Sequence, residues 1–328
     1  MSAPMIFSRT PFRISLGGGS TDLPSYSRKF GGFIFGFAIQ MYMDIFVRKP
    51  VIYDRVDLQY LEFESEESPE KLRHPIARTA LNMIGIKRAV SIYFKSDTPM
   101  GTGLGSSGAC AVGLLNALYK YTGIEKSQHD LAEDAFTITQ DLGLPDGKQD
   151  PYLTALGGFI AIEIDQNDKA RFWRPEITEP TVNLFLANTL FFYSGIKRES
   201  TDILRSQEHG NALALKHKTK EIGRQILRAF TAGNLEDFGR LMHEHWILKK
   251  EMSDKITSPE LDDVYGLAIK NGALGGKLIG AGGGGYFLFY CPDEGKKQEV
   301  SYAMRTVGFR EIPIAVDKKG TRVQKIDF

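Results

Sequence analysis

A glycine- and serine-rich segment at residues 99–108, PMGTGLGSSG, constrains this chain more than any other feature of its sequence. It lies between a strand-like stretch at 90–97 and an alanine- and leucine-rich run at 109–118 that is typical of a helix. Glycine lets the backbone approach a ligand with no Cβ in the way, and a helix N-terminus offers unpaired N–H groups and a positive dipole end. The pattern predicts a phosphate-binding loop. The alternative is a plain glycine-rich turn between a strand and a helix.

This loop matches neither of two common nucleotide-binding signatures. No Gly-Lys-Ser or Gly-Lys-Thr ends it, which excludes a Walker A loop. Its glycine spacing also differs from that of the dinucleotide fingerprint of Rossmann folds. The loop therefore indicates another class of phosphate-binding protein.

The composition limits the other functions open to the chain. Its 328 residues are 42% hydrophobic, which is enough for one large or two ordinary domains. Lys and Arg number 41 and Asp and Glu 40, so no net charge draws the protein to nucleic acid or an anionic membrane. The two cysteines, Cys110 and Cys291, form no CxxC pair, which argues against a disulfide scaffold or a zinc site. With no signal-peptide pattern and no apolar run of about 18 residues, we expect a cytoplasmic protein that binds neither nucleic acid nor membranes.

Alternating strand-like and helix-like patterns predict an α+β protein. Strands are expected at 5–16, 33–51, 54–63, 90–97, 159–164, 184–193, 286–291 and 309–316. Helices are expected at 77–85, 109–118, 127–142 and 261–271, and over most of 200–252. A proline-rich stretch at 174–180 favours a domain boundary between about 175 and 190.

Three further segments are rich in glycine and polar residues. They are 11–22 (PFRISLGGGSTD), 147–152 (GKQDPY) followed by Gly157 and Gly158, and 277–286 (KLIGAGGGGY). In this order and spacing, the four segments resemble the motifs of the GHMP kinase superfamily. The resemblance implies a two-domain α+β fold, with a ribosomal protein S5 domain 2-like, ATP-binding domain at 1–185 and a ferredoxin-like domain at 186–328. It places ATP in the cleft between the two domains.

Within that superfamily, three features resemble the D-glycero-D-manno-heptose phosphate kinases. They are the GGGSTD sequence of the first segment, the Gly-Lys-Gln-Asp sequence of the third, and the stretch YSGIKRES at 193–200. The resemblance implies ATP-dependent phosphorylation of the anomeric hydroxyl of D-glycero-D-manno-heptose 7-phosphate to the 1,7-bisphosphate, by a monomer or homodimer. The alternatives are a kinase for another sugar, fucose- or galactose-like, and a non-catalytic sensor of sugar and nucleotide.

The resemblance also assigns the groups that would carry the reaction. Asp150 would accept the proton of the attacking hydroxyl or orient that hydroxyl, although an aspartate before a proline can also cap a helix. Arg13 would lie beside it and stabilise charge on the transferring phosphoryl group; the alternative is a surface charge on an edge strand. The implied ATP-binding residues are Gly101, Gly103, Leu104, Gly105, Ser106, Ser107 and Gly108.

The first and last segments would contact the acceptor sugar. The implied substrate-binding residues are Gly18, Gly19, Ser20, Asp22, Arg198, Gly283 and Gly284. Cations in or near the matching segments are Arg9, Arg28, Lys29, Lys197 and Arg198. Arg198 is our first choice for the substrate phosphate, because a guanidinium binds phosphate bidentately. The alternatives are a helix N-cap for Asp22, a tight turn for 282–285, and a solvated loop or helix start for Arg198.

Mg²⁺ is the expected partner of ATP, and one departure from the family affects its site. Ser107 would supply a hydroxyl ligand, since Mg²⁺ prefers oxygen. Family members carry a glutamate in the helix before the third segment, but Thr139 occupies that place here. Asp141 would replace it after a small shift of register, and Glu133 is a weaker candidate.

Overall fold

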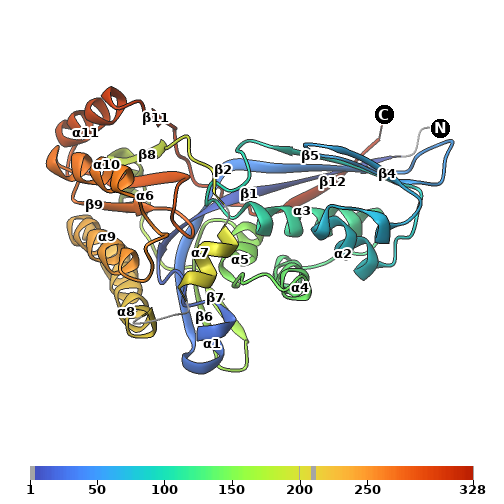
Figure 1. Ribbon diagram of the computed structural model, residues 1–328, viewed down its shortest axis with the longest axis horizontal. Helices are drawn as coiled ribbons and strands as arrows, with labels where there is room; N and C mark the ends of the chain where they lie inside the picture. The colour runs from blue at the N-terminus through green and yellow to red at the C-terminus, as the bar shows by residue number, and fades with distance from the viewer. Residues whose placement is uncertain (1–3, 199, 208–211, 328) are drawn as a thin grey trace.

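The computed structural model describes residues 4–198, 200–207 and 212–327, which form two β-sheets with helices packed against both (Figure 1). Glu199, in the 193–200 stretch, lies outside the described residues. The larger sheet has eight strands, in the order β12-β1-β2-β5-β3-β4, with β6 paired to β2 and β7 to β6. These pairs are antiparallel except for β3 and β5, which are parallel. The strands are β1 (Met5–Gly17), β2 (Gly32–Arg48), β3 (Val56–Gln59), β4 (Phe63–Glu66), β5 (Val90–Ser96), β6 (Phe159–Ile164), β7 (Ala170–Trp173) and β12 (Arg322–Ile326).

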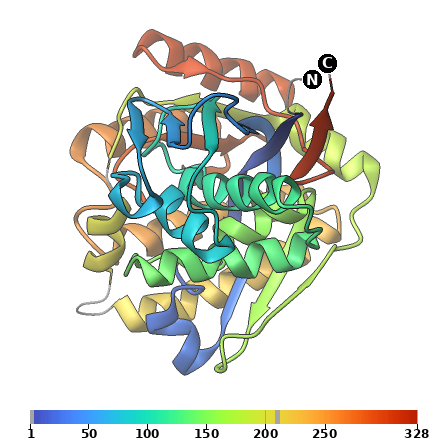
Figure 2. The ribbon, with the colours of Figure 1, turned by 90° about the vertical axis from the view of Figure 1, so that its right-hand side faces the viewer.

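Helices cover one face of the larger sheet (Figures 1 and 2). They are α2 (Pro75–Ile84), α3 (Ser106–Tyr121), α4 (Gln128–Asp141) and α5 (Gln149–Leu156), and two short elements, α1 (Pro24–Phe30) and the 3₁₀ turn η1 (Pro69–Lys71), complete this part. Residues 108–119 of α3 are all buried. Small residues let α3 lie close to the strands: a Cβ on Gly113 would be 2.8 Å from Oγ1 of Thr10. The burial of α3 therefore holds the loop that precedes it at one place on the sheet.

Strand β2 shows how burial follows the sequence. Its residues 32–39 are apolar or glycine and buried at every position, where α5 and α8 (Ala212–Thr231) both contact the strand. From 40 to 48 the pattern alternates, with Met43, Ile45 and Val47 buried. A strand covered on both faces needs a continuous apolar run, whereas a strand covered on one face needs alternation. The first half of β2 is therefore covered on both faces, whereas its second half is covered on one face.

The smaller sheet has four antiparallel strands in the order β11-β8-β10-β9. They are β8 (Thr189–Tyr193), β9 (Gly275–Leu278), β10 (Tyr286–Tyr290) and β11 (Arg310–Glu311). The helices of this part are α6 (Glu179–Asn188), α7 (Ser200–Ser206), α8, α9 (Leu235–Lys250), α10 (Pro259–Lys270) and α11 (Glu294–Thr306). All five residues of β10 are buried: Leu288 joins the core shared with the larger sheet, while Phe287 and Phe289 pack in a second core with residues of α10 and α11.

The two parts share one core and exchange chain segments. Phe185 and Phe230 stack edge to face with ring centroids 5.0 Å apart, and Phe230 lies 5.2 Å from Phe159 of the larger sheet. Near its end the chain returns to the larger sheet: the N–H of Gln40 donates to the Ala315 carbonyl over 2.9 Å, and β12 pairs with β1. A segment from the predicted 186–328 domain thus completes the first sheet. The division at 185/186 falls inside α6 and stays a prediction.

The α+β class is confirmed, and so are most of the predicted elements. The strand predicted at 184–193 is wrong in its first half, because α6 runs to Asn188. Thr178 caps that helix, since its hydroxyl accepts the N–H of Thr181 over 3.3 Å, and Pro180 lies in the first turn. The strand predicted at 309–316 is reduced to β11, and the stretch at 54–63 is divided between β3 and the start of β4. Strands β7, β9 and β12 were not predicted.

Within the described residues, none of the helices has the length and apolar character that a membrane crossing requires. The cytoplasmic location and the choice between monomer and homodimer stay predictions.

Candidate active site

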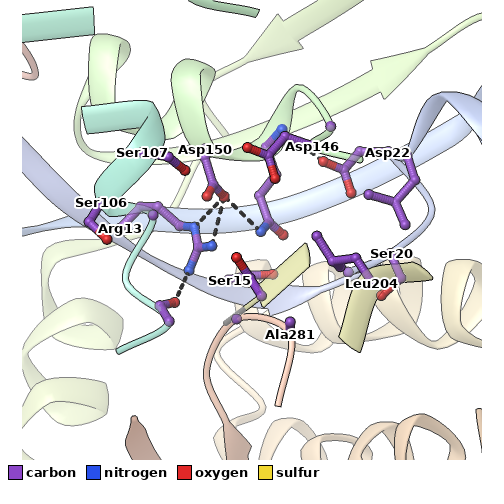
Figure 3. Close-up of a pocket in the computed structure, with 18 of the residues that line it drawn as sticks. Arg13, Ser15, Ser20, Asp22, Ser106, Ser107, Asp146, Asp150, Leu204 and Ala281 are labelled. Atoms are coloured by element: carbon purple, nitrogen blue, oxygen red, sulfur yellow. Dashed lines mark hydrogen bonds and ion pairs between the residues drawn. The ribbon is translucent and has the colours of Figure 1, made fainter. Parts of the chain in front are cut away.

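A pocket lies where the two parts of the molecule meet, and all four glycine- and polar-rich segments reach it (Figure 3). Strand β1, the loop before α3, the start of α5 and the turn after β9 contribute to its walls. The predicted site residues that line it are Arg13, Gly19, Ser20, Asp22, Gly101, Gly103, Gly105, Ser106, Ser107, Asp150 and Arg198. The fourth segment takes part through Lys277, Gly280 and Ala281.

The predicted catalytic pair is in direct contact. Arg13 donates from Nε to Oδ1 of Asp150 over 2.7 Å, and its Nη2 lies 2.7 Å from the same oxygen. Its Nη1 donates to the Gly103 carbonyl over 2.5 Å, so one guanidinium joins the carboxylate to the loop. Arg13 is only 3% exposed, which rules out a surface charge. Lys148, not Asp150, is the N-cap of α5, so Asp150 is not a helix cap.

Close packing holds Asp150 in place. A Cβ on Gly105 would lie 3.1 Å from Cγ of Arg13 and 3.2 Å from Cγ of Asp150. A Cβ on Gly108 would lie 2.6 Å from Cβ of Asp150, so α3 approaches α5 this closely only with glycine there. The side-chain amide of Gln149 donates to Oδ1 of Asp150 over 3.1 Å. The acidic member of the pair is therefore positioned by groups from three elements.

Asp22 ties the first segment to the third. Its Oδ2 accepts the backbone N–H of Gln149 over 2.9 Å. Leu23, not Asp22, is the N-cap of α1, so the helix-cap alternative for Asp22 is wrong. Asp22 is buried yet lines the pocket, which leaves its carboxylate in position to accept hydrogen bonds from a ligand.

The loop has the conformation that its glycines allow. The backbone φ angles lie in the left-handed region at 76° for Gly101, 86° for Gly103 and 76° for Gly105. The fourth segment packs directly on the loop, because a Cβ on Gly103 would lie 2.1 Å from the Ile279 carbonyl oxygen. Helix α3 follows at once, and no side chain caps its first-turn N–H groups. This geometry fits an anion at the helix N-terminus.

Three aspartates converge beside the loop: Asp22, Asp146 and Asp150 (Figure 3). Burial raises the pKa of Asp22 to about 6. Burial, together with repulsion from Asp150 and Asp22, raises the pKa of Asp146 to about 7, and a hydrogen bond with Ser107 opposes this rise. A cation bound between these oxygens would relieve the repulsion, and carboxylate and hydroxyl oxygens are ligands that Mg²⁺ prefers.

The aspartates do not form a complete metal cage. Over the described part of the chain, no three His, Cys, Asp or Glu side chains are grouped so that they could hold a metal ion by themselves. Mg²⁺ in nucleotide-dependent enzymes usually takes one or two carboxylates and fills its other positions with phosphate oxygens and water. The donor set here fits that kind of ion.

Asp146, rather than Asp141, faces the pocket, so the prediction that Asp141 is a metal ligand there is wrong. Asp141 is the exposed last residue of α4 and does not line the pocket. Glu133 pairs with Lys148 over 2.5 Å. Thr139 is buried in the family's glutamate place and supplies no carboxylate. The sequence could have indicated Asp146, because it directly precedes Gly147, the first residue of the third segment.

Other predicted residues support the pocket walls without lining them. They are Gly18, Leu104, Gly108, Gly283 and Gly284. A Cβ on Gly18 would lie 1.9 Å from the Phe33 carbonyl oxygen, and the N–H of Gly283 donates to the Ile256 carbonyl over 2.7 Å. These contacts favour the tight-turn interpretation of 282–285, and Gly280 and Ala281 are the members of that segment that reach the pocket.

The positive wall of the pocket was only partly predicted. Arg198 lines it as expected. Lys249 of α9 and Lys277 of β9 also line it, although neither lysine was predicted to bind a ligand. The other candidate cations lie elsewhere. Arg9 pairs with Asp44, Arg28 pairs with Asp168, and Lys29 and Lys197 are exposed.

Comparison with known proteins shows the family of this chain. The chain matches the GHMP kinases N terminal domain family over residues 73–158 and the GHMP kinases C terminal family over 226–309. A D-glycero-alpha-D-manno-heptose 7-phosphate kinase of Campylobacter jejuni is 30% identical over 322 residues, covering 92% of this chain and 93% of that protein. The chain belongs to the GHMP kinases. It is therefore an ATP-dependent phosphotransferase, as the four segments predicted.

Solved structures confirm the two-domain GHMP kinase fold. A D-glycero-D-manno-heptose 1-phosphate kinase from Bacteroides thetaiotaomicron has a TM-score of 0.82 and 24% identity, covering 98% of this chain and 100% of that chain. A putative sugar kinase from Campylobacter jejuni has a TM-score of 0.78 and 26% identity, covering 98% of both chains.

The substitution Lys249→Met should change how the stability of this GHMP kinase depends on pH. Burial, together with repulsion from Arg198 and Arg13, lowers the pKa of Lys249 from its ordinary 10.5 to about 7. Between these values the unfolded chain binds a proton that the folded chain does not, so the wild type gains stability as pH rises from about 7 to about 10. Lys249 in turn lowers the pKa of Lys277 and of His245, although burial is the larger cause for both. The variant lacks this titration, so its free energy of unfolding in urea should rise less over this range.

The control for this measurement is Lys270→Met, which removes an exposed lysine at the end of α10. It should follow the wild type at every pH. Equal pH dependence for the wild type and Lys249→Met would show that Lys249 keeps an ordinary pKa.

Proposed function

We propose that this GHMP kinase transfers the terminal phosphoryl group of ATP to the anomeric hydroxyl of D-glycero-D-manno-heptose 7-phosphate. The products are the 1,7-bisphosphate and ADP. The observation that carries the proposal is the contact between the buried Arg13 and Asp150 next to the phosphate loop. The choice of sugar is supported by the 30% identity to a relative named for this substrate.

The reaction needs a base, positive charge and alignment. Asp150 takes the proton of the anomeric hydroxyl, or holds that hydroxyl in line, as its oxygen attacks the terminal phosphorus. The new O–P bond forms while the bond from that phosphorus to the bridging oxygen of ADP breaks. Arg13 places positive charge beside the transferring group, and its bonds to Asp150 and Gly103 keep the base aligned with the loop. The loop and first-turn N–H groups of α3 bind the nucleotide phosphates.

Ser107 and Asp146 are the protein ligands that we propose for Mg²⁺. They lie together in the pocket beside the phosphate loop, where burial and repulsion from Asp150 and Asp22 raise the pKa of Asp146. When bound, the ion would neutralise charge on the nucleotide phosphates.

Asp146→Asn should raise the Mg²⁺ concentration that gives half-maximal turnover by about tenfold or more, because a neutral amide is a weaker ligand than a carboxylate. The measurement is a Mg²⁺ titration of ADP release at fixed ATP. Asp141→Asn is the matched control, since it makes the same change at the exposed end of α4. If both variants require the same Mg²⁺ concentration as the wild type, Asp146 is not a ligand.

The proposed substrate is tested by ADP release with Mg·ATP across a panel of acceptors. The panel contains D-glycero-D-manno-heptose 7-phosphate, the free heptose, L-fucose, D-galactose and mevalonate. Turnover restricted to the heptose phosphate supports the proposal. Turnover on fucose or galactose would replace it with a kinase for another sugar. Binding of sugar and ATP without turnover of any acceptor would favour the sensor interpretation.

A further inference from the structure

Three basic side chains form one wall of the pocket, and we call Arg198, Lys249 and Lys277 the basic cluster. They come from three places: the segment between β8 and α7, the end of α9, and strand β9. Lys249 is 5% exposed and Lys277 is 2% exposed. His245, one turn before Lys249 on α9, is fully buried behind them. Such burial is unusual for lysine unless a partner is present.

The basic cluster has no anionic partner among the residues that the structure describes. Among the described residues, no carboxylate forms an ion pair or hydrogen bond with Arg198, Lys249 or Lys277. The two lysines donate only to backbone: Lys249 to the Gly280 carbonyl, and Lys277 to the Leu16 carbonyl over 3.1 Å. Nε and Nη2 of Arg198 are buried with no hydrogen-bond partner in the described part of the chain.

This arrangement is unfavourable in the free protein. Removing a charge from water is costly unless an opposite charge and hydrogen bonds replace the water. Burial, together with repulsion from neighbouring cations that include Arg13, lowers the pKa of all three members, that of Arg198 to about 10. Asp150, the acid that acts on Arg198 among the described residues, already pairs with Arg13. An anion that entered the pocket would supply the missing charge and accept the free N–H groups.

Arg198 lies against the phosphate loop, since its backbone N–H donates to the Gly101 carbonyl over 3.2 Å, but the position of Lys277 favours the acceptor over the nucleotide as the source of this anion. The phosphate loop and α3 already offer N–H groups for ATP. Lys277 reaches the carbonyl of Leu16, directly before the GGGSTD segment, whose Gly19, Ser20 and Asp22 line the other side of the pocket. Figure 3 shows Ala281, next to the Gly280 carbonyl that Lys249 contacts, across the pocket from Asp22 and Asp146.

We propose that Lys249 and Lys277, together with Arg198, bind the phosphate group that the acceptor sugar already carries, and so select sugar phosphates over free sugars. The proposal rests on the proposed function, because it concerns the acceptor of the same reaction. Arg198 contributes a planar fork of donors, and the two lysines contribute charge from below the pocket surface. The dianionic phosphate supplies the counter-ion that the described residues do not provide.

The first test is calorimetric binding of D-glycero-D-manno-heptose 7-phosphate and of the free heptose to the wild type, Lys249→Met and Lys277→Met, with Mg·AMP-PNP present throughout. Each substitution should weaken binding of the heptose phosphate by about 10- to 100-fold, the range for loss of a charge-assisted hydrogen bond. Binding of the free heptose should change by less than about twofold. The control Lys270→Met should match the wild type for both ligands. Unchanged affinity for the heptose phosphate in both variants would overturn the proposal.

A second measurement does not depend on the identity of the sugar. With Mg·AMP-PNP saturating the loop, inorganic phosphate should raise the melting temperature of the wild type more than sodium chloride of equal ionic strength does. The two lysine variants should lose this increase and still unfold cooperatively, since methionine preserves most of the buried volume. Loss of AMP-PNP binding in the variants would assign the cluster to the nucleotide and overturn the proposal. This readout needs no turnover, so it separates failure of the cluster from failure of the proposed kinase reaction.

Discussion

Asp150→Asn should lower kcat by about 10²- to 10⁴-fold while leaving the affinity for ATP nearly unchanged. The amide cannot accept the proton of the attacking hydroxyl, and general base catalysis contributes about this much to enzymatic rates. The loss should appear in kcat because Asp150 acts on the acceptor hydroxyl and the nucleotide phosphates are bound by the loop. The measurements are coupled-assay kinetics and calorimetric binding of AMP-PNP.

The same variant should remain folded, since asparagine keeps an oxygen that can accept the hydrogen bond from Nε of Arg13. Its melting temperature should therefore lie close to that of the wild type. Asp141→Asn, at the exposed end of α4, should keep full activity. A near-normal kcat for Asp150→Asn would remove Asp150 from the reaction.

Arg13→Met should lower kcat by about 10²- to 10³-fold, which is the effect of removing one preorganised charge-stabilising donor from an active site. It should also lower the melting temperature, because Arg13 is buried and Asp150 would lose its partner. Kinetics and thermal unfolding together therefore report on two roles of one guanidinium.

The double variant Arg13→Met/Asp150→Asn separates these roles. It removes the unpaired carboxylate, so we expect it to recover much of the melting temperature that Arg13→Met loses, with no recovery of kcat. If restoring stability also restores turnover, Arg13 is only a structural partner of Asp150. Arg13→Lys should be nearly as inactive as Arg13→Met, since one ammonium cannot hold Asp150 and the Gly103 carbonyl in the same geometry.

The parts of the site that the sequence predicted well are those with a local backbone requirement. The loop needs glycine at 101, 103 and 105, because all three have positive φ angles. The glycine at 108 has another cause, the close approach of α3 to Asp150. A local backbone requirement of this kind appears in the sequence as a short run with glycines at fixed positions. The pairing of Arg13 with Asp150, 137 positions apart, came from the resemblance to GHMP kinases rather than from any local pattern.

The basic cluster, in contrast, could not be predicted from a short sequence pattern. Lys249 and Lys250 are neighbours at the end of α9, but only Lys249 points into the pocket, while Lys250 pairs with Asp262 over 2.8 Å. Which lysine is buried depends on how α9 packs against β9, and that packing is a tertiary contact. The choice between Asp141 and Asp146 likewise depended on where α4 ends and how the chain turns before α5.

The incorrect strand at 184–188 had a different cause, because its helix signals were present in the chain. Thr178 is an N-cap residue and Pro180 is typical of a first helical turn. The apolar residues Leu184, Phe185 and Leu186 were instead interpreted as the start of the strand that follows. Short apolar runs fit a helix or a strand equally well, and here the cap decides between them.

The most direct test of the central claim is to identify the product that the purified wild type forms from Mg·ATP and D-glycero-D-manno-heptose 7-phosphate. Proton-coupled phosphorus NMR would follow the reaction. We predict a new phosphate resonance that couples to the anomeric proton, while the 7-phosphate resonance persists and ADP accumulates in equal amount. A new phosphate on any other carbon, or no new phosphate although sugar and nucleotide both bind, would contradict the account.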